Sequence, residues 1–103
     1  MENHITILYC TQCRWLLRSA WMAQELLTTF DKEITDLTLK PGKGGIFQIW
    51  INDELAWSRQ EAGRFPEIKE LKQLVRDRVA PDKDLGHSDK KKPDYSLLKT
   101  QQE

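Results

Sequence analysis

The sequence predicts a small α/β sandwich in which two helices pack against a mixed four-stranded sheet. Its elements follow in the order strand, helix, strand, strand, strand, helix. A strand–helix–strand unit makes a parallel, right-handed crossover. The last two strands are separated by two residues, Asn52 and Asp53, which is typical of an antiparallel hairpin. A parallel pair and an antiparallel pair together predict a mixed sheet.

The first strand is predicted at residues 4–9. Ile5, Ile7 and Tyr9 alternate with Thr6 and Leu8, in a short run rich in β-branched residues. Because both faces carry an apolar residue, we expect this strand to be central in the sheet and covered on both sides.

The first helix is predicted at residues 12–30, a stretch without Gly or Pro. Apolar residues recur there at steps of three and four, which indicates one buried stripe. The stripe is Leu16, Ala20, Ala23, Leu27 and Phe30, widened by Trp15, Leu17, Trp21 and Leu26. Trp21, Trp50 and Trp57 lie in periodic segments and are predicted to be core, while Trp15 is either core or a partly exposed docking residue.

Three further strands are predicted. Residues 34–39 have one wetter face and suit an edge strand, and residues 40–45 form a loop with three glycines and a proline. Residues 46–51 are the strongest strand pattern, and residues 54–57 complete the hairpin.

The last helix is predicted from Pro66, a residue that suits the first helical position, to Ala80. Residues 58–65 before it are predicted to be irregular. After Pro81 the chain is polar, so we expect one folded domain over residues 1–80 and a flexible tail over residues 81–103.

The overall charge excludes some classes of protein. The 103 residues carry sixteen Lys and Arg against sixteen Asp and Glu, so no global basic field attracts nucleic acid or an anionic membrane. Apolar runs are far shorter than the ~20 residues of a spanning helix. The chain starts without an apolar signal segment, and we therefore expect a cytoplasmic protein with mostly reduced thiols.

The two cysteines, Cys10 and Cys13, form a CxxC motif where the first strand gives way to the first helix. Open α/β sheets place their chemistry at the carboxyl ends of strands. A helix N-terminus stabilises a thiolate, and the motif is expected to lie within the first turn. Arg14 and Arg18 add positive charge, and no Asp or Glu occurs between Tyr9 and Gln24. The spacing lets one sulfur resolve a mixed disulfide formed by the other.

Three different roles for the two cysteines compete with a redox pair. A zinc site needs three or four ligands, and only His4, His87 and carboxylates are left to join the cysteines, so no metal site is predicted. The cysteines can also be inert core residues. A purely structural disulfide is seldom kept in the cytosol.

The stretch from Tyr9 to Leu27, which begins Tyr-Cys-Thr-Gln-Cys-Arg-Trp, resembles the cysteine-containing bacterial branch of the selenoprotein W-like, or Rdx, family. Residues 45–49 are similar to that family's glycine-then-Phe strand, and residues 63–67 to the start of its last helix. The resemblance covers residues 4–80 and implies a thioredoxin-like fold with a thiol-redox role. It does not include the tail.

The resemblance leaves the order of attack open. Thioredoxin-type chemistry makes Cys10 the attacking thiol and Cys13 the resolving one, and this is the order that we predict. Selenocysteine in several relatives corresponds to Cys13, which suggests the reverse. No cis-proline facing the motif is evident, and Gly44 and Gly45 either lie beside the cysteines as open backbone for a partner or simply form a turn. The predicted binding residues are Thr11, Gln12, Arg14, Trp15, Gly44 and Gly45.

The leading functional hypothesis is a thiol–disulfide oxidoreductase in cell redox homeostasis. We expect it to use Cys10 and Cys13 as its catalytic residues and to need no cofactor. Its expected partners are a glutathione or thioredoxin-type electron donor and protein thiols, with no nucleic acid or membrane; its oligomeric state is left open. One alternative is a redox-sensitive adaptor without turnover. Another is a sacrificial thiol buffer.

Overall fold

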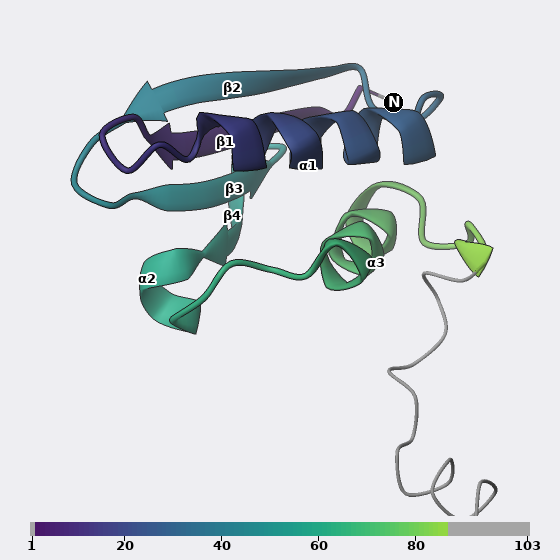
Figure 1. Cartoon of the computed structure of the whole chain (residues 1–103). Helices are drawn as coiled ribbons and strands as arrows, with labels where there is room; N and C mark the ends of the chain where they lie inside the picture. Colours follow the sequence, from purple (N-terminus) through teal and green to yellow (C-terminus); the bar gives the residue numbers. More distant parts are fainter. Residues whose placement is uncertain (1, 87–103) are drawn as a thin grey trace, which may run out of the picture.

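The computed structural model describes residues 2–86, which form a four-stranded sheet in the order β2-β1-β3-β4 with three helices (Figure 1). The elements are β1 (His4–Cys10), α1 (Leu16–Thr29), β2 (Asp36–Gly42), β3 (Phe47–Ile51), β4 (Glu54–Ser58), α2 (Arg59–Ala62) and α3 (Ile68–Val79). β1 pairs with β2 in parallel and with β3 antiparallel, and β4 pairs antiparallel with β3. The predicted mixed sheet and element order are confirmed, and the short α2 lies in the stretch predicted to be irregular.

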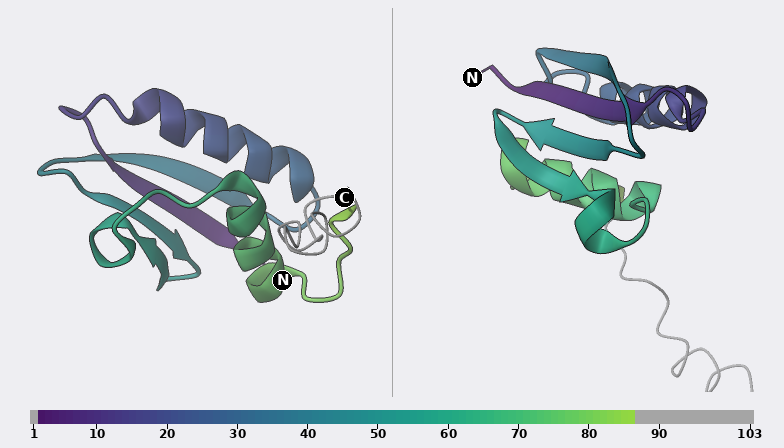
Figure 2. Two further views of the ribbon diagram at one scale, coloured as in Figure 1. Left: turned by 60° about the horizontal axis from the view of Figure 1, so that its bottom comes forward. Right: turned by 90° about the vertical axis from the view of Figure 1, so that its left-hand side faces the viewer.

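One face of the sheet carries the hydrophobic core. Ile5 and Ile7 of β1 and Ile49 of β3 are fully buried, in one cluster with residues of both α1 and α3. These helices therefore lie on the same side of the sheet (Figures 1 and 2). β1 is central, as predicted, but its expected coverage on both sides is wrong.

Within residues 2–86 no helix covers the opposite face of the sheet. Trp50 of β3 is half-buried there and lines a shallow hollow with Thr6, Leu8 and Gln48. Its indole N–H donates to the Gln48 side chain at 3.0 Å. Apolar residues on both faces of β1 and β3 therefore did not require a covering layer on each face. Leu8 and Trp50 lie on the uncovered face and stay half-buried there.

α1 begins at Leu16, not at residue 12, and its buried face differs from the predicted stripe. The buried positions are Ser19, Met22, Ala23 and Leu26, followed by Phe30. Leu16, Leu17, Trp21 and Leu27 are instead exposed. Trp21 and Trp50 are therefore not core as predicted, whereas Trp57 is partly buried and packs against the core. A helix with apolar residues around most of its surface leaves the buried side ambiguous in the sequence.

Two element boundaries also differ from prediction. β2 continues through Pro41 to Gly42, because an edge strand can direct the position without an N–H toward solvent. α3 starts at Ile68 rather than at Pro66, with Glu67 as the N-cap. Glu67 and Glu70 form a reciprocal capping box there, which satisfies two backbone N–H groups that a helix start leaves free.

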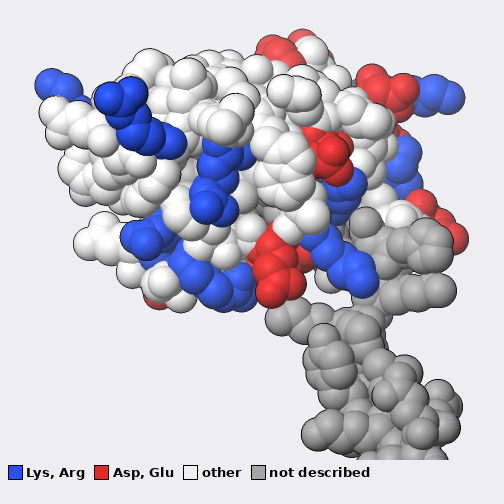
Figure 3. All heavy atoms as spheres, viewed as in Figure 1, with Lys and Arg blue, Asp and Glu red and all other residues white. Residues whose placement is uncertain are grey.

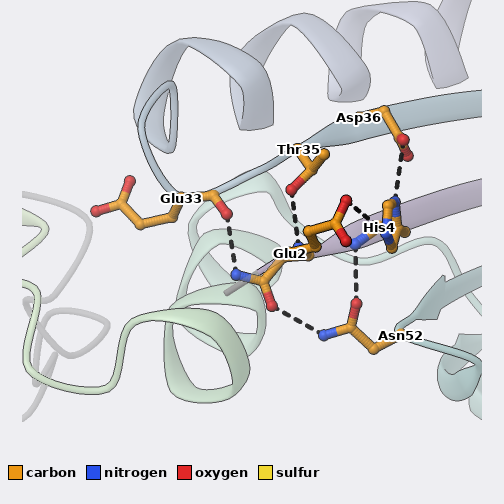
Figure 4. Close-up of polar contacts among 7 residues, drawn as sticks. Glu2, His4, Glu33, Thr35, Asp36 and Asn52 are labelled. Carbon is orange, nitrogen blue, oxygen red and sulfur yellow. Dashed lines mark hydrogen bonds and ion pairs between the residues drawn. The ribbon is translucent and has the colours of Figure 1, made fainter.

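A hydrogen-bond network fastens the end of the sheet where β1 starts (Figure 4). The Asn3 side chain donates to the carbonyl of Glu33 at 2.9 Å and accepts from Asn52 at 2.9 Å. The His4 ring lies 3.0 Å from the Asp36 carboxylate, and this hydrogen bond and its charge raise the pKa of His4 above its usual 6.5. The network ties β1 to β2 and to the hairpin turn, whose Asn52 and Asp53 have the positive φ angles of a tight turn.

The described start of the predicted tail, residues 81–86, contacts the domain. Lys83 pairs with Glu33 at 3.1 Å, and its carbonyl accepts from Arg76 at 2.9 Å. Leu85 packs partly buried against the core. His87 and the rest of the predicted tail lie outside the described residues, and the domain boundary at residue 80 stays a prediction.

Candidate functional site

Cys10 and Cys13 are joined as a disulfide at the end of β1, with their Cα atoms 5.4 Å apart. The two cysteines differ in access. Cys10, the last residue of the central strand, is 1% exposed, whereas Cys13 is only half-buried in the turn that follows. Cys13 is thus the more accessible of the two cysteines.

The turn between the cysteines is held by backbone hydrogen bonds. The N–H of Thr11 donates to the carbonyl of Gly42 at 3.1 Å, and the N–H of Arg14 donates to the carbonyl of Thr11 at 3.1 Å. Arg14 has a φ of 61°, a left-handed conformation that ends the turn. Trp15 then caps α1, since its carbonyl accepts the N–H of Ser19 at 2.9 Å.

This turn separates the cysteines from the helix. The expectation that both lie within its first turn is wrong, because the left-handed Arg14 delays the helix until Leu16. The field of a helix N-terminus falls off within about one turn. Cys13 thus lies two residues before the N-cap Trp15, and Cys10 lies at the end of β1.

An aromatic cluster packs around Trp15, the residue that follows the turn. The ring of Phe65 makes edge-to-face contacts with Trp15 and with Phe47, each at a centroid distance of 4.9 Å. The guanidinium of Arg18 lies 4.3 Å from the Phe65 centroid, and that of Arg59 lies 5.0 Å from the Trp15 ring. The cluster joins α1, β3 and the α2–α3 connection behind the cysteine turn.

Basic side chains gather at this end of the molecule. In the view of Figure 3 most Lys and Arg at the left end have no acidic neighbour, and most Asp and Glu lie toward the other end. Lys43 and Arg59 line one hollow at this end, together with Gly44 and Gly45. Arg14 and Arg18 line another on the α1 side. Hollows at this end of the molecule therefore carry basic side chains, an arrangement that suits anionic ligands.

The predicted binding residues fall into two groups. Thr11, Gln12 and Arg14 are exposed in the cysteine turn itself, and Trp15 is half-buried in the aromatic cluster. Gly44 and Gly45 form the turn from β2 to β3 with φ angles of 73° and 75°. Their turn lies at the same end of the sheet as the cysteines (Figure 1). A role for these six residues in binding stays a prediction.

Three structural residues of the site were not predicted. Gly42 contacts the cysteine turn directly, and Arg59 and Phe65 pack against Trp15 or one another. Gly42 lies opposite Cys10 in the pairing of β1 with β2. Only the register of the β1–β2 pair reveals that Gly42 contacts the turn. For the aromatic cluster the sequence did offer a signal, the large aromatic residue Phe65 directly before Pro66.

Among residues 2–86 no group of three or more His, Cys, Asp and Glu side chains is placed to hold a metal ion. No helix within the same residues is long and apolar enough to cross a membrane.

The fold and the motif define a class: thioredoxin-like α/β proteins with a CxxC pair after the first strand. Within that class, the chain belongs to the Rdx family, whose sequence profile matches residues 4–77.

Two bacterial crystal structures are similar to this chain, each with a TM-score of 0.73. One is a protein from Bordetella parapertussis, 55% identical, covering 75% of this chain and 98% of its own. The other is a selenoprotein W-related protein from Vibrio cholerae, 52% identical, covering 75% of this chain and 96% of its own. Comparison with curated proteins gave no match.

Proposed function

We propose that the protein is a thiol–disulfide oxidoreductase that uses Cys10 and Cys13 in cell redox homeostasis, in the cytoplasm. One observation carries the proposal: Cys10 and Cys13 are within bonding reach at the end of the central strand, with Cys10 buried and Cys13 only half-buried. Membership in a family with selenoprotein W-related proteins supports it. Glutathione or a thioredoxin-type protein is the proposed electron donor.

Unequal burial supports Cys13 as the attacking residue, the reverse of the thioredoxin-type order. In the reduced protein the Cys13 thiolate attacks one sulfur of a substrate disulfide, and the other substrate sulfur leaves as a thiolate. The buried Cys10 thiolate then attacks the Cys13 sulfur and releases the second substrate thiolate. Two electrons pass to the substrate, whose thiolates take up the protons that the cysteines lost. A thioredoxin-type dithiol returns the electrons by the reverse exchange, or two glutathione molecules do so in turn and leave as one glutathione disulfide.

Single substitutions test this mechanism. Reduced Cys10→Ser and Cys13→Ser proteins are mixed with oxidised glutathione, and adducts are counted by mass over time. We expect Cys10→Ser, which keeps the accessible Cys13, to form a stable glutathione adduct at least about tenfold faster than Cys13→Ser. The opposite order restores Cys10 as the attacker. Adducts on neither variant would remove both cysteines from thiol exchange.

A redox-sensitive adaptor without turnover is the second candidate. It is favoured by the exposed apolar side chains of Leu16 and Leu17, which directly follow the cysteine turn. An adaptor binds its partner in only one oxidation state and shows no repeated turnover with glutathione and glutathione reductase. Continuous turnover in that coupled assay decides for the oxidoreductase.

A further inference from the structure

The outer surface of α1 next to the cysteine turn carries three exposed large apolar side chains. Leu17 is 82% exposed, Leu16 is 50% and Trp21 is 46%. Leu17 and Trp21 are four residues apart, so they lie on one face of the helix. We call Leu16, Leu17 and Trp21 the α1 ridge. Clustered exposed apolar groups of this kind mark interaction surfaces more often than isolated ones do.

Two shallow hollows adjoin the ridge. The first, about 440 Å³, is lined by Tyr9, Thr11, Arg14, Leu16 and Leu17. The second, about 400 Å³, is lined by Arg14, Trp15, Leu17, Arg18 and Trp21. Arg14 and Leu17 line both hollows. A chain bound in these hollows therefore contacts Arg14 and Leu17 in both of them, and Thr11 of the cysteine turn in the first.

The charge around the ridge has one sign. Arg14 and Arg18 are the charged residues that line the two hollows, and no carboxylate lines either one. Neither cysteine lines the hollows, but Thr11 and Arg14, which line the first one, directly follow Cys10 and Cys13 in the chain, so this hollow lies next to the cysteine turn. The ligand that complements this surface is a polypeptide segment with apolar side chains and at least one carboxylate, both close in the chain to a cysteine sulfur.

We propose that the α1 ridge is the docking surface for protein thiol partners, and that it selects a cysteine flanked by apolar and acidic residues. The proposal rests on the proposed function, because it names the substrate class of the same cysteine pair. Apolar contact with Leu17 and Trp21 supplies affinity, and Arg14 and Arg18 select the acidic sequence. A charged apolar surface also suits an anionic membrane, but the position beside the disulfide favours a thiol substrate.

The test measures how fast the reduced full-length protein attacks three synthetic peptides. Each peptide carries one cysteine as a mixed disulfide with thiopyridine, flanked by Leu and Glu, by Leu and Lys, or by Ser and Glu. The Cys13 thiolate bonds to the peptide sulfur and thiopyridone leaves with the electron pair of the broken bond, which is followed by absorbance. Rates are divided by the rate of the same protein with neutral dipyridyl disulfide, which reports thiol reactivity alone.

We expect the Leu and Glu peptide to react about tenfold faster than the Leu and Lys peptide at low salt, with the preference falling as salt is added. Leu17→Ser lowers the normalised rate of that peptide about fivefold. Leu27→Ser is the matched control, since Leu27 is exposed on the same helix but far from the cysteines, and leaves it unchanged. Arg14→Asn tolerates the left-handed backbone and reduces the preference for Glu over Lys.

Equal normalised rates for the three peptides, or equal effects of Leu17→Ser and Leu27→Ser, would overturn the docking proposal. So would binding to phosphatidylglycerol vesicles, or dimer formation in sedimentation, that depends on Leu17 while the peptide rates do not. Failure of the proposed function is a different result. In that case mass analysis after dipyridyl disulfide finds thiopyridyl adducts in place of a Cys10–Cys13 disulfide.

Discussion

The carbonyl oxygen of Gly42 accepts the backbone N–H of Thr11 at 3.1 Å, so the last residue of β2 holds the first residue after Cys10. The same two residues are joined by the Thr11 hydroxyl, 3.4 Å from the Gly42 oxygen. A parallel neighbour strand thereby fixes the start of the cysteine turn. Position 42 has little room for a side chain, because a Cβ there would lie 2.8 Å from Cγ2 of Ile46 and 3.1 Å from Cδ1 of Leu8.

Gly42→Ala is therefore expected to lower the free energy of unfolding by about 1–3 kcal/mol. The β-branched Ile46 cannot rotate away freely, so the β2 backbone shifts and the Thr11 hydrogen bond weakens. Hydrogen exchange of the Thr11 amide measures this shift. Gly63→Ala is the control: it places a side chain at a φ of 77° but in open space, so it destabilises without changing Thr11 exchange. Equal Thr11 protection in both variants would contradict the role given to Gly42.

Leu26 and Leu27 test which face of α1 is buried. Leu26 is fully buried in the core, whereas Leu27 is 41% exposed. We expect Leu26→Ala to lower the free energy of unfolding by about 2–5 kcal/mol, because it leaves a cavity. Leu27→Ala should cost less than about 1 kcal/mol. Urea denaturation of the two oxidised variants measures both, and a larger loss at Leu27 would reverse the orientation of the helix.

His4 predicts a pH dependence of stability. Its pKa is raised in the folded protein through Asp36, so its stabilising contribution is complete below the unfolded pKa of about 6.5 and is lost as pH rises through the folded pKa. We expect the difference in urea midpoint between wild type and His4→Gln to shrink between pH 5.5 and pH 8.5. Asp36→Asn should abolish most of that change. A difference that grows with pH would exclude a raised pKa.

The contact between Trp15 and Phe65 can be measured by a double-mutant cycle. Trp15→Leu, Phe65→Leu and the double variant keep apolar side chains but remove the edge-to-face geometry. We expect a coupling free energy of about 0.5–1.5 kcal/mol. Zero coupling would mean that the two rings contribute independently and that Phe65 does not help to hold Trp15, the N-cap residue of α1 that follows the turn.

The order of the elements and the mixed sheet were predictable because the strand patterns are short and apolar, and are separated by a helix pattern, a glycine-rich loop and a two-residue turn. Ile5, Ile7 and Ile49 report burial directly, and Asn52 and Asp53 make the turn that was expected. Which face of α1 and which face of the sheet are buried was not predictable. Leu17 and Trp21 fit a buried stripe as well as Leu26 does, and the choice is made by where β1 and α3 lie, which no local pattern records.

The cysteine chemistry of the candidate site was predictable, but the residues that hold the cysteine turn in place were not. The spacing of Cys10 and Cys13 indicated a pair, and the structure joins them. The delayed start of α1 depends on a left-handed Arg14, a conformation that few non-glycine residues adopt and that the sequence does not announce. Gly42 contacts Thr11 of the turn and Phe65 contacts the N-cap Trp15, both across the fold, so only the folded chain identifies these two residues.

A redox titration of the Cys10–Cys13 pair measures whether the two cysteines cycle between dithiol and disulfide. The pure protein is equilibrated in glutathione buffers of graded potential, quenched, alkylated and weighed to count free thiols. We expect one reversible two-thiol transition at roughly −180 to −300 mV, as for working redox pairs. An intramolecular disulfide that forms at no potential, or that persists across the whole range, would contradict a redox function for these two cysteines.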